Sequence, residues 1–218
     1  IAAGPLAPLR AARVARQIAS ALASAHAQGI VHRDLKPENV MLVSKGTEAD
    51  LVKVLDFGIA RVPIAEDASF SAKPLTKAGM VFGTPEYMAP EQALDTHSVD
   101  ARADIYSLGC TLYRLLTGKT PYQADSFAKL FLAHLNDPIP RLCEARPDVP
   151  PALEAVYQKM MAKRPENRQP SMREVIAELQ TCVAAPGKSS AGSAGDRWMQ
   201  ENLSFLREST GAATAVEK

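Results

Sequence analysis

The chain has 218 residues, 46% of them hydrophobic and 22% charged, and its 25 basic and 24 acidic residues leave a net charge of +1. This balance is typical of a globular protein with one main domain, and it argues against a surface that grips nucleic acid. No window approaches the roughly 18 uninterrupted apolar residues of a membrane span, and the N-terminus lacks the pattern of a signal peptide. Cys110, Cys143 and Cys182 are far apart, which favours a reducing, cytoplasmic setting without a disulfide framework.

The first half of the chain predicts one helix and two short strands. Val14, Ile18 and Leu22 recur at helical spacing within an alanine-rich stretch, which predicts a helix over residues 9–28 that stops at Gly29. Short strands are predicted over residues 40–43 and 51–55. Residues 61–89 show no sustained period, and a long segment of this kind in a compact domain is usually functional.

The second half returns to helices. Leucines and isoleucines lie on nearly every side of residues 104–117, which predicts a buried central helix closed by Gly118. Further helices are predicted over residues 126–135, 151–162 and 171–182. Residues 184–195 have the composition of a flexible linker, and residues 196–218 form a tail with a candidate short amphipathic helix. The predicted fold class is therefore mainly α with a little sheet.

Polar side chains crowd the stretch VHRDLKPENVML, at residues 31–42, which reads as a loop leading into a strand. Asp34, Lys36 and Asn39 lie within six residues of one another, and Asp56 follows the second predicted strand. Carboxylate and amide oxygens suit Mg²⁺, which is usually held by one or two carboxylates together with substrate phosphates. Phosphoryl transfer needs a metal, a carboxylate that receives a hydroxyl proton and a nearby cation, and this stretch supplies candidates for each role.

Five motifs, in this order, carry a resemblance to a known family: HRDLKPEN at 32–39, DFG at 56–58, GTPEYMAPE at 83–91, DIYSLG at 104–109 and the arginine of KRPENR at 163–168. Over about residues 5–183 the chain resembles the eukaryotic-like protein kinases, and most closely their bacterial serine/threonine branch. The resemblance implies the helical C-terminal lobe of the protein kinase fold, with a β-hairpin carrying the catalytic and DFG loops. Residues 1–183 would then be a partial catalytic domain.

The resemblance also implies roles for residues at the centre of the site. Asp34 is expected to orient the substrate hydroxyl and accept its proton, while Asn39 and Asp56 are expected to hold magnesium. Lys36 would stabilise charge on the γ-phosphate, and Thr84 would bridge Asp34 and Lys36 as in the serine/threonine branch. Lys36, Asn39 and Asp56 are therefore also nucleotide-binding candidates.

A second group of residues is expected to support the site. The resemblance implies that His32 packs beneath Phe57 and binds backbone, and that Glu91 and Arg168 form an ion pair that clamps the substrate-binding segment. For Asp104 the sequence pattern favours a helix N-cap, worth about 1 kcal/mol. The resemblance instead implies that Asp104 holds the catalytic loop, and both roles stay open at this point.

Three further positions concern the nucleotide and regulation. Met41 is most simply a core residue of its strand, and the resemblance adds a place in the floor of the adenine site. Arg33 precedes the catalytic aspartate, a pattern typical of kinases that are switched by phosphorylation of the following loop, since a phosphate pairs well with arginine. Thr76 is the favoured autophosphorylation site, ahead of Ser69 and Ser71.

The implied activity is transfer of the γ-phosphate of ATP to serine or threonine hydroxyls of protein substrates, with Mg²⁺, or alternatively Mn²⁺, and with self-association for autophosphorylation. The chain as given holds no glycine-rich GxGxxG loop or strand lysine of the VAIK type, which the family carries in its N-terminal lobe. We therefore expect this stretch alone to be nearly inactive. The alternative is a non-catalytic interaction or regulatory module, but the intact Asp34, Asn39 and Asp56 favour the enzyme.

Overall fold

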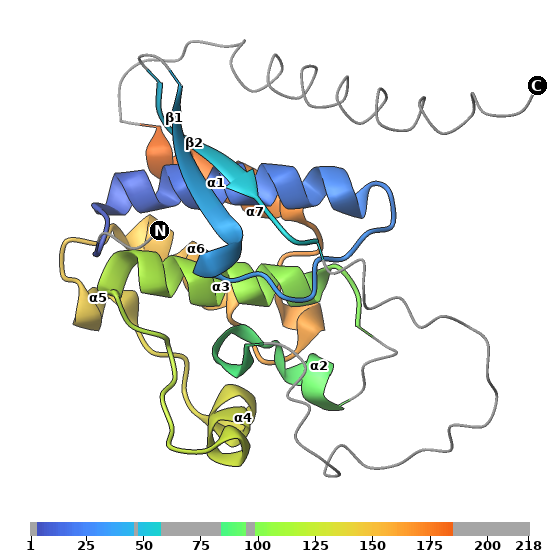
Figure 1. The fold of residues 1–218 in the computed structure, drawn as a ribbon. Helices are drawn as coiled ribbons and strands as arrows, with labels where there is room; N and C mark the ends of the chain where they lie inside the picture. Colours follow the sequence, from blue (N-terminus) through green and yellow to red (C-terminus); the bar gives the residue numbers. More distant parts are fainter. Residues whose placement is uncertain (1–3, 46–47, 58–83, 95–98, 185–218) are drawn as a thin grey trace, which may run out of the picture. The chain divides into compact units, whose positions relative to one another are not determined.

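The computed structural model describes residues 4–45, 48–57, 84–94 and 99–184 (Figure 1). The chain divides into two units, residues 1–183 and 184–218, and all described residues except Ala184 lie in the first. Several predicted features lie outside the described residues, namely Gly58 of the DFG motif, Ser69, Ser71, Thr76, most of the linker and the tail.

In the described part of the first unit, helices predominate and one pair of strands is present. The elements are α1 (Pro8–His26), β1 (Val40–Lys45), β2 (Glu48–Val54), α2 (Pro90–Leu94), α3 (Arg102–Thr117), α4 (Phe127–Asn136), α5 (Leu142–Ala145), α6 (Pro151–Met160) and α7 (Met172–Val183), with 3-10 turns η1 (Pro37–Asn39), η3 (Pro85–Tyr87) and η4 (Pro165–Asn167). The helices and strands predicted within the described residues are confirmed, with ends that differ by a few residues. The helices α2 and α5 were not predicted, because one turn is too short to show a hydrophobic period.

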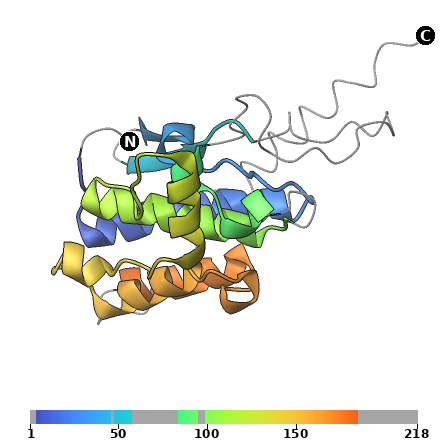
Figure 2. The same cartoon turned by 90° about the horizontal axis from the view of Figure 1, so that it is seen from below.

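Helix α3 is the centre of the core. Twelve of its sixteen residues are buried, and it packs against α1 and α6, while α7 packs against α1. Figure 2 shows α6 and α7 on one side of the α1 and α3 layer and the strand pair on the opposite side. Gly109 allows close packing here, because a Cβ at that position would lie 2.8 Å from Sδ of Met161. The structure therefore places a closely packed helical body under the strand pair.

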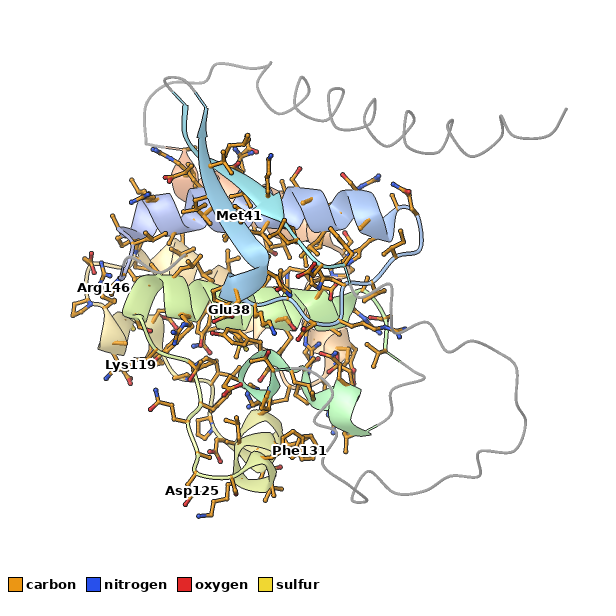
Figure 3. The ribbon with its side chains drawn as sticks, viewed as in Figure 1. Glu38, Met41, Lys119, Asp125, Phe131 and Arg146 are labelled. Atoms are coloured by element: carbon orange, nitrogen blue, oxygen red, sulfur yellow. The ribbon has the colours of Figure 1, made fainter. Side chains whose placement is uncertain are left out.

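Strands β1 and β2 form an antiparallel pair in which Val40 lies opposite Val54 and Met41 opposite Lys53. Neighbouring side chains in a strand point to opposite faces, so Val40 is buried against the helical body whereas Met41 is 48% exposed (Figure 3). The prediction that Met41 is a core residue is therefore wrong. Among the described residues, no helix is both long and apolar enough to span a bilayer.

Candidate active site

The site begins where α1 ends, because the chain then turns toward the buried carboxylate of Asp104. Gly29 takes a left-handed conformation with φ of 75° in this turn. The carboxylate of Asp104 accepts the backbone N–H groups of His32 and Arg33, each at 2.8 Å, and lies 2.7 Å from Nε2 of His26. Three donors thus converge on a side chain with no exposed surface.

The N-cap interpretation of Asp104 is wrong. Helix α3 begins earlier, at Arg102, and its N-cap residue is Ala101, which makes no side-chain capping bond. Asp104 lies inside the first turn with its carboxylate directed at the loop, so the residue ties residues 32–33 to the central helix. Local sequence could not distinguish these two roles, because both place an aspartate near the start of a helix.

His32 connects the same loop to the end of β2. Its Nδ1 accepts the backbone N–H of Asp34 at 3.3 Å, so the neutral ring carries its proton on Nε2, which donates to the carbonyl of Leu55 at 3.1 Å. The ring centroid lies 4.9 Å from that of Phe57. His32 therefore lies between the loop that carries Asp34 and the segment that carries Asp56.

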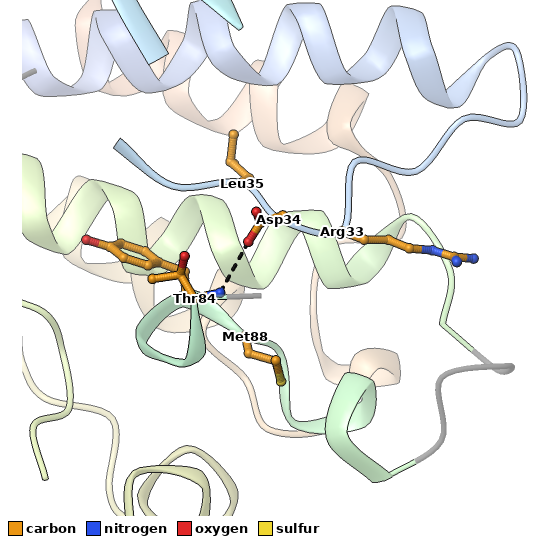
Figure 4. Close-up of a pocket in the computed structure, with 6 residues that line it drawn as sticks. Arg33, Asp34, Leu35, Thr84 and Met88 are labelled. Carbon is orange, nitrogen blue, oxygen red and sulfur yellow. Dashed lines mark hydrogen bonds between the residues drawn. The ribbon is translucent and has the colours of Figure 1, made fainter. Parts of the chain in front are cut away.

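Asp34, Lys36 and Thr84 form a compact polar cluster. Nζ of Lys36 donates to Oγ1 of Thr84 at 2.6 Å and lies 3.4 Å from Oδ2 of Asp34. The backbone N–H of Thr84 donates to the other oxygen, Oδ1 of Asp34, at 3.3 Å (Figure 4). Residues that are far apart in the sequence thus fix the orientation of one half-buried carboxylate.

Asn39 lies next to this cluster and close to the segment that carries Asp56. Its side-chain Nδ2 donates to the backbone carbonyl of Asp34 at 2.9 Å. The backbone carbonyl of Asn39 accepts the N–H of Leu55 at 2.8 Å. Within the described residues, neither Oδ1 of Asn39 nor the carboxylate of Asp56 has a hydrogen-bond partner. Oxygen donors of these types suit Mg²⁺, so the residues fit the metal that the sequence predicts.

Two residues of the site have strained backbones. Arg33 has φ of 63° and Asp56 has φ of 53°, in the left-handed region that residues with a Cβ rarely adopt. Each such conformation costs about 1–3 kcal/mol and persists only where surrounding contacts hold it. Strain of this kind gathers at functional sites, and here it lies directly beside Asp34 and at the first residue of the DFG motif.

A small cavity opens at Asp34. It is lined by Arg33, Asp34, Leu35, Thr84, Tyr87 and Met88, and it holds about 10 Å³, the room that one water molecule or hydroxyl group needs (Figure 4). Burial raises the pKa of the Tyr87 phenol well above its ordinary value, so this wall of the cavity is uncharged. In Figure 4 the side chain of Arg33 extends away from Asp34.

Below the site, Arg168 is bound to Glu91 of α2 in a two-pronged ion pair. Nη1 and Nη2 donate to the two carboxylate oxygens at 2.6 and 2.8 Å. The remaining three N–H groups donate to the carbonyls of Ala162, Arg102 and Lys163. All five donors of a guanidinium with no exposed side-chain surface are thus satisfied.

Sequence reasoning missed two residues that touch the site, His26 and Gln92. His26 reaches Asp104 from the last turn of α1, and Gln92 of α2 donates to the carbonyl of Arg33 at 2.9 Å. Their partners are 78 and 59 residues away in the chain, so no local spacing indicates these contacts. Only the adjacency of Gln92 to Glu91 hinted that this helix meets the site.

Comparison with known proteins places the chain in a family. The model of the protein kinase domain matches residues 2–179. The chain is 43% identical to the serine/threonine-protein kinase pkn3 of Myxococcus xanthus over 81% of its length, and 49% identical to PknD of Mycobacterium tuberculosis over 76%. These matches cover 32% and 23% of the two relatives, so the chain spans about a quarter to a third of their length.

A solved structure agrees with the fold. The crystal structure of Rad53 residues 1–466, in complex with AMP-PNP, matches 84% of this chain with a TM-score of 0.63 and 24% identity, and the match covers 42% of that chain. At this identity the likeness concerns the fold alone. The family model and the curated relatives together establish that the chain belongs to the protein kinase domain family, in its bacterial serine/threonine branch.

Proposed function

We propose that the protein of which this chain is part is a serine/threonine protein kinase, and that Asp34 is its catalytic base. The observation that carries the proposal is the cluster of Asp34, Lys36 and Thr84, in which both oxygens of one carboxylate have fixed neighbours beside a cavity of hydroxyl size. Membership of the serine/threonine branch supports it. Nothing in the described part of the chain favours the alternative, a non-catalytic module.

In the proposed reaction, a serine or threonine hydroxyl enters the cavity and its proton passes to Asp34. The hydroxyl oxygen forms a bond to the γ-phosphorus of ATP while the bond from that phosphorus to the bridging oxygen breaks, which releases ADP. Lys36, held by Thr84, is close enough to Asp34 for its ammonium group to stabilise negative charge on the transferred group. The bond from Thr84 N–H keeps the carboxylate from rotating.

Asn39 and Asp56 are the proposed ligands of Mg²⁺, with Mn²⁺ as a substitute. The metal would neutralise phosphate charge and so supply the electrostatic part of catalysis. Both side chains extend from the ends of the strand pair. The strained backbone sets the direction of Asp56, and the hydrogen bond from Nδ2 to the backbone carbonyl of Asp34 sets that of Asn39. Met41, exposed on β1, is the proposed contact for the adenine ring.

We assign residues 1–183 to the C-terminal lobe of the kinase domain. The mainly helical body and the strand pair, which carries both loops, support this assignment. In the family, the second lobe covers the nucleotide, so the site on this chain would bind ATP weakly by itself. Met41 on β1 and Leu55 just after β2 are exposed apolar side chains, which supports a contact between such a cover and the strand pair.

The proposal is tested on the native polypeptide, purified over its whole length, with γ-labelled ATP, Mg²⁺ and a serine- and threonine-containing acceptor protein. We expect labelled phosphoserine or phosphothreonine and no phosphotyrosine. Asp56→Asn should raise the Mg²⁺ concentration needed for half-maximal rate by at least about tenfold, because one carboxylate ligand is lost. Absence of any transfer by the unmodified protein would favour the non-catalytic module instead.

A further inference from the structure

Gln92, on helix α2, makes three hydrogen bonds that join two parts of the site. Its backbone N–H donates to the carbonyl of Ala89 at 3.0 Å, and its Oε1 accepts the backbone N–H of Ala89 at 2.9 Å. Because Pro90 is the first residue of α2, Gln92 is the third, the position from which a glutamine or glutamate side chain reaches back to cap a helix N-terminus. The first role of Gln92 is thus structural.

The cap also fixes which way the amide of Gln92 faces. Since Oε1 is occupied by the N–H of Ala89, the NH₂ group must point the other way, and Nε2 donates to the carbonyl of Arg33 at 2.9 Å. The acceptor belongs to the strained residue directly before Asp34. A capping residue does not need this second bond, because glutamate caps a helix equally well without donating anything.

The peptide groups around Arg33 are held from two sides. Its N–H donates to the carboxylate of Asp104 on α3, and its carbonyl accepts from Gln92 on α2. A left-handed residue that is not glycine needs such constraints to remain in place. Rotation about Arg33 would move Asp34, the next residue, relative to Thr84 and to the cavity.

We propose that Gln92 is a positioning residue for phosphate transfer, which locks the carbonyl of Arg33 to helix α2 and so couples the segment containing Thr84 to the backbone that carries Asp34. The inference rests on the proposed function. Glu91, the neighbour of Gln92, binds Arg168, so α2 is anchored in the helical body through one side chain and grips the catalytic loop through the next. This arrangement transmits the position of the helical body to the catalytic loop.

The chain allows the structural and positioning roles to be separated. Gln92→Glu keeps an oxygen for the N–H of Ala89 but cannot donate to Arg33, whereas Gln92→Met removes both bonds at similar volume. Gln158 provides a matched control, because its Nε2 also donates to a backbone carbonyl, that of Pro140, at 3.4 Å, and to Glu154. Gln158→Met therefore removes a glutamine side-chain contact outside the site.

The first measurement is steady-state phosphate transfer by the native polypeptide. One lost hydrogen bond at the loop should lower kcat of Gln92→Glu by about tenfold, with KM for ATP within about twofold of the original and a small drop in the midpoint of chemical unfolding. Gln92→Met loses both side-chain bonds, so it should lose kcat to a similar extent and lose more stability. Gln158→Met should keep the original kcat. An unchanged kcat in Gln92→Glu would overturn the proposal.

The second measurement is hydrogen exchange, which does not depend on activity. In Gln92→Glu the amides of residues 32–34 should exchange about tenfold faster while that of Ala89 stays protected, and in Gln92→Met both groups should exchange faster. Unchanged exchange of residues 32–34 in both variants would overturn the inference even if transfer is observed. A protein that transfers no phosphate overturns the proposed function, while the exchange data still decide whether Gln92 holds the loop.

Discussion

Two polar networks in this protein hold charge in opposite ways: one buries Arg168, whereas the other leaves Asp34 partly exposed and Asp56 exposed. Around Arg168, every donor of the guanidinium meets an oxygen of the protein, and both oxygens of Glu91 are used. Around Asp34, the backbone is held as firmly, but within the described residues Asp56 and Oδ1 of Asn39 keep oxygen atoms without partners. We call the first network closed, because all its hydrogen-bonding groups are paired, and it can only stabilise the fold. We call the second network open, because it keeps the oxygen atoms that the proposed chemistry needs.

The open network around Asp34 is supported by residues whose hydrogen bonds hold its backbone. Asp104, His32 and Gln92 each bind the backbone of residues 32–34, and His32 also binds the carbonyl of Leu55, so the strained backbone of Arg33 is held by its neighbours. A site whose outer groups must stay available for substrate needs such support, since those groups cannot hold themselves in place. The comparison therefore predicts that variants divide into those that cost stability and those that cost activity.

Breaking the closed network should have the largest effect on stability. Arg168→Met leaves the carboxylate of Glu91 and three carbonyls without their donor, and we expect a loss of about 3–5 kcal/mol in the free energy of unfolding. Urea unfolding followed by circular dichroism measures it. Arg168→Lys should recover only a small part, because one ammonium cannot replace five donors in a plane. A loss below about 1 kcal/mol for Arg168→Met would show that the network is not closed as described.

Acid should weaken the helical body through His134. Burial, helped by the nearby Lys163 ammonium, lowers the pKa of His134 to about 4, and its Nδ1 lies 2.9 Å from the hydroxyl of Tyr106. The unfolded chain binds a proton near pH 6.5, so this group's contribution is fully present above about pH 6.5 and falls toward pH 4, by roughly 3 kcal/mol in total.

Thermal unfolding between pH 4 and pH 7 measures this effect. His134→Asn keeps an acceptor for Tyr106 but does not titrate, so the difference in stability from the original protein should shrink as the pH falls. Parallel pH profiles for the two proteins would exclude His134 as the source. Because His134 lies in the helical body rather than at the site, this effect of acid should lower stability without acting on the catalytic groups directly.

A change at Asp104, which supports the backbone of the site, should lower both stability and activity. In Asp104→Asn, one oxygen must serve the donors that now share two carboxylate oxygens, and the new NH₂ group faces a backbone N–H. We therefore expect a loss of about 1–3 kcal/mol in the free energy of unfolding, together with a reduced kcat. Chemical unfolding and phosphate transfer on the same preparation measure the two effects. Asp100→Asn is the control, because that carboxylate is half exposed and pairs with Arg102 at the surface. Equal behaviour of the two variants would contradict the role given to Asp104.

The smallest effect is expected for an exposed pair. Lys129 and Asp125 lie 2.9 Å apart on the surface of the molecule, with about two thirds of each side chain exposed. Solvent screens such a pair, and Lys129→Ala should change the free energy of unfolding by about 0.5 kcal/mol or less. Urea unfolding at low and high salt checks this. A loss of unfolding free energy as large as that of Arg168→Met would contradict the claim that buried ion pairs stabilise this protein more than exposed ones.

Sequence predicted the parts of the molecule that are encoded locally. Helix α1 was foreseen from its spacing of apolar residues, and the proximity of Asp34, Lys36 and Asn39 was foreseen because they lie within six residues of one another. Met41 was misjudged because a hydrophobic strand does not indicate which face is covered. His26 and Gln92 were missed because their bonds close only when distant segments fold together. Alternatives for Asp104 were likewise decided only by the direction of its carboxylate.

The most direct test of the central claim is to measure phosphate transfer and the free energy of unfolding of Asp34→Asn, side by side with the original protein, on the native polypeptide. Asparagine retains an oxygen for the N–H of Thr84 but cannot accept the substrate proton. We expect transfer to fall by about 10²–10⁴-fold while the free energy of unfolding changes by less than about 1 kcal/mol. Transfer at the original rate, or loss of activity only through unfolding, would contradict the account.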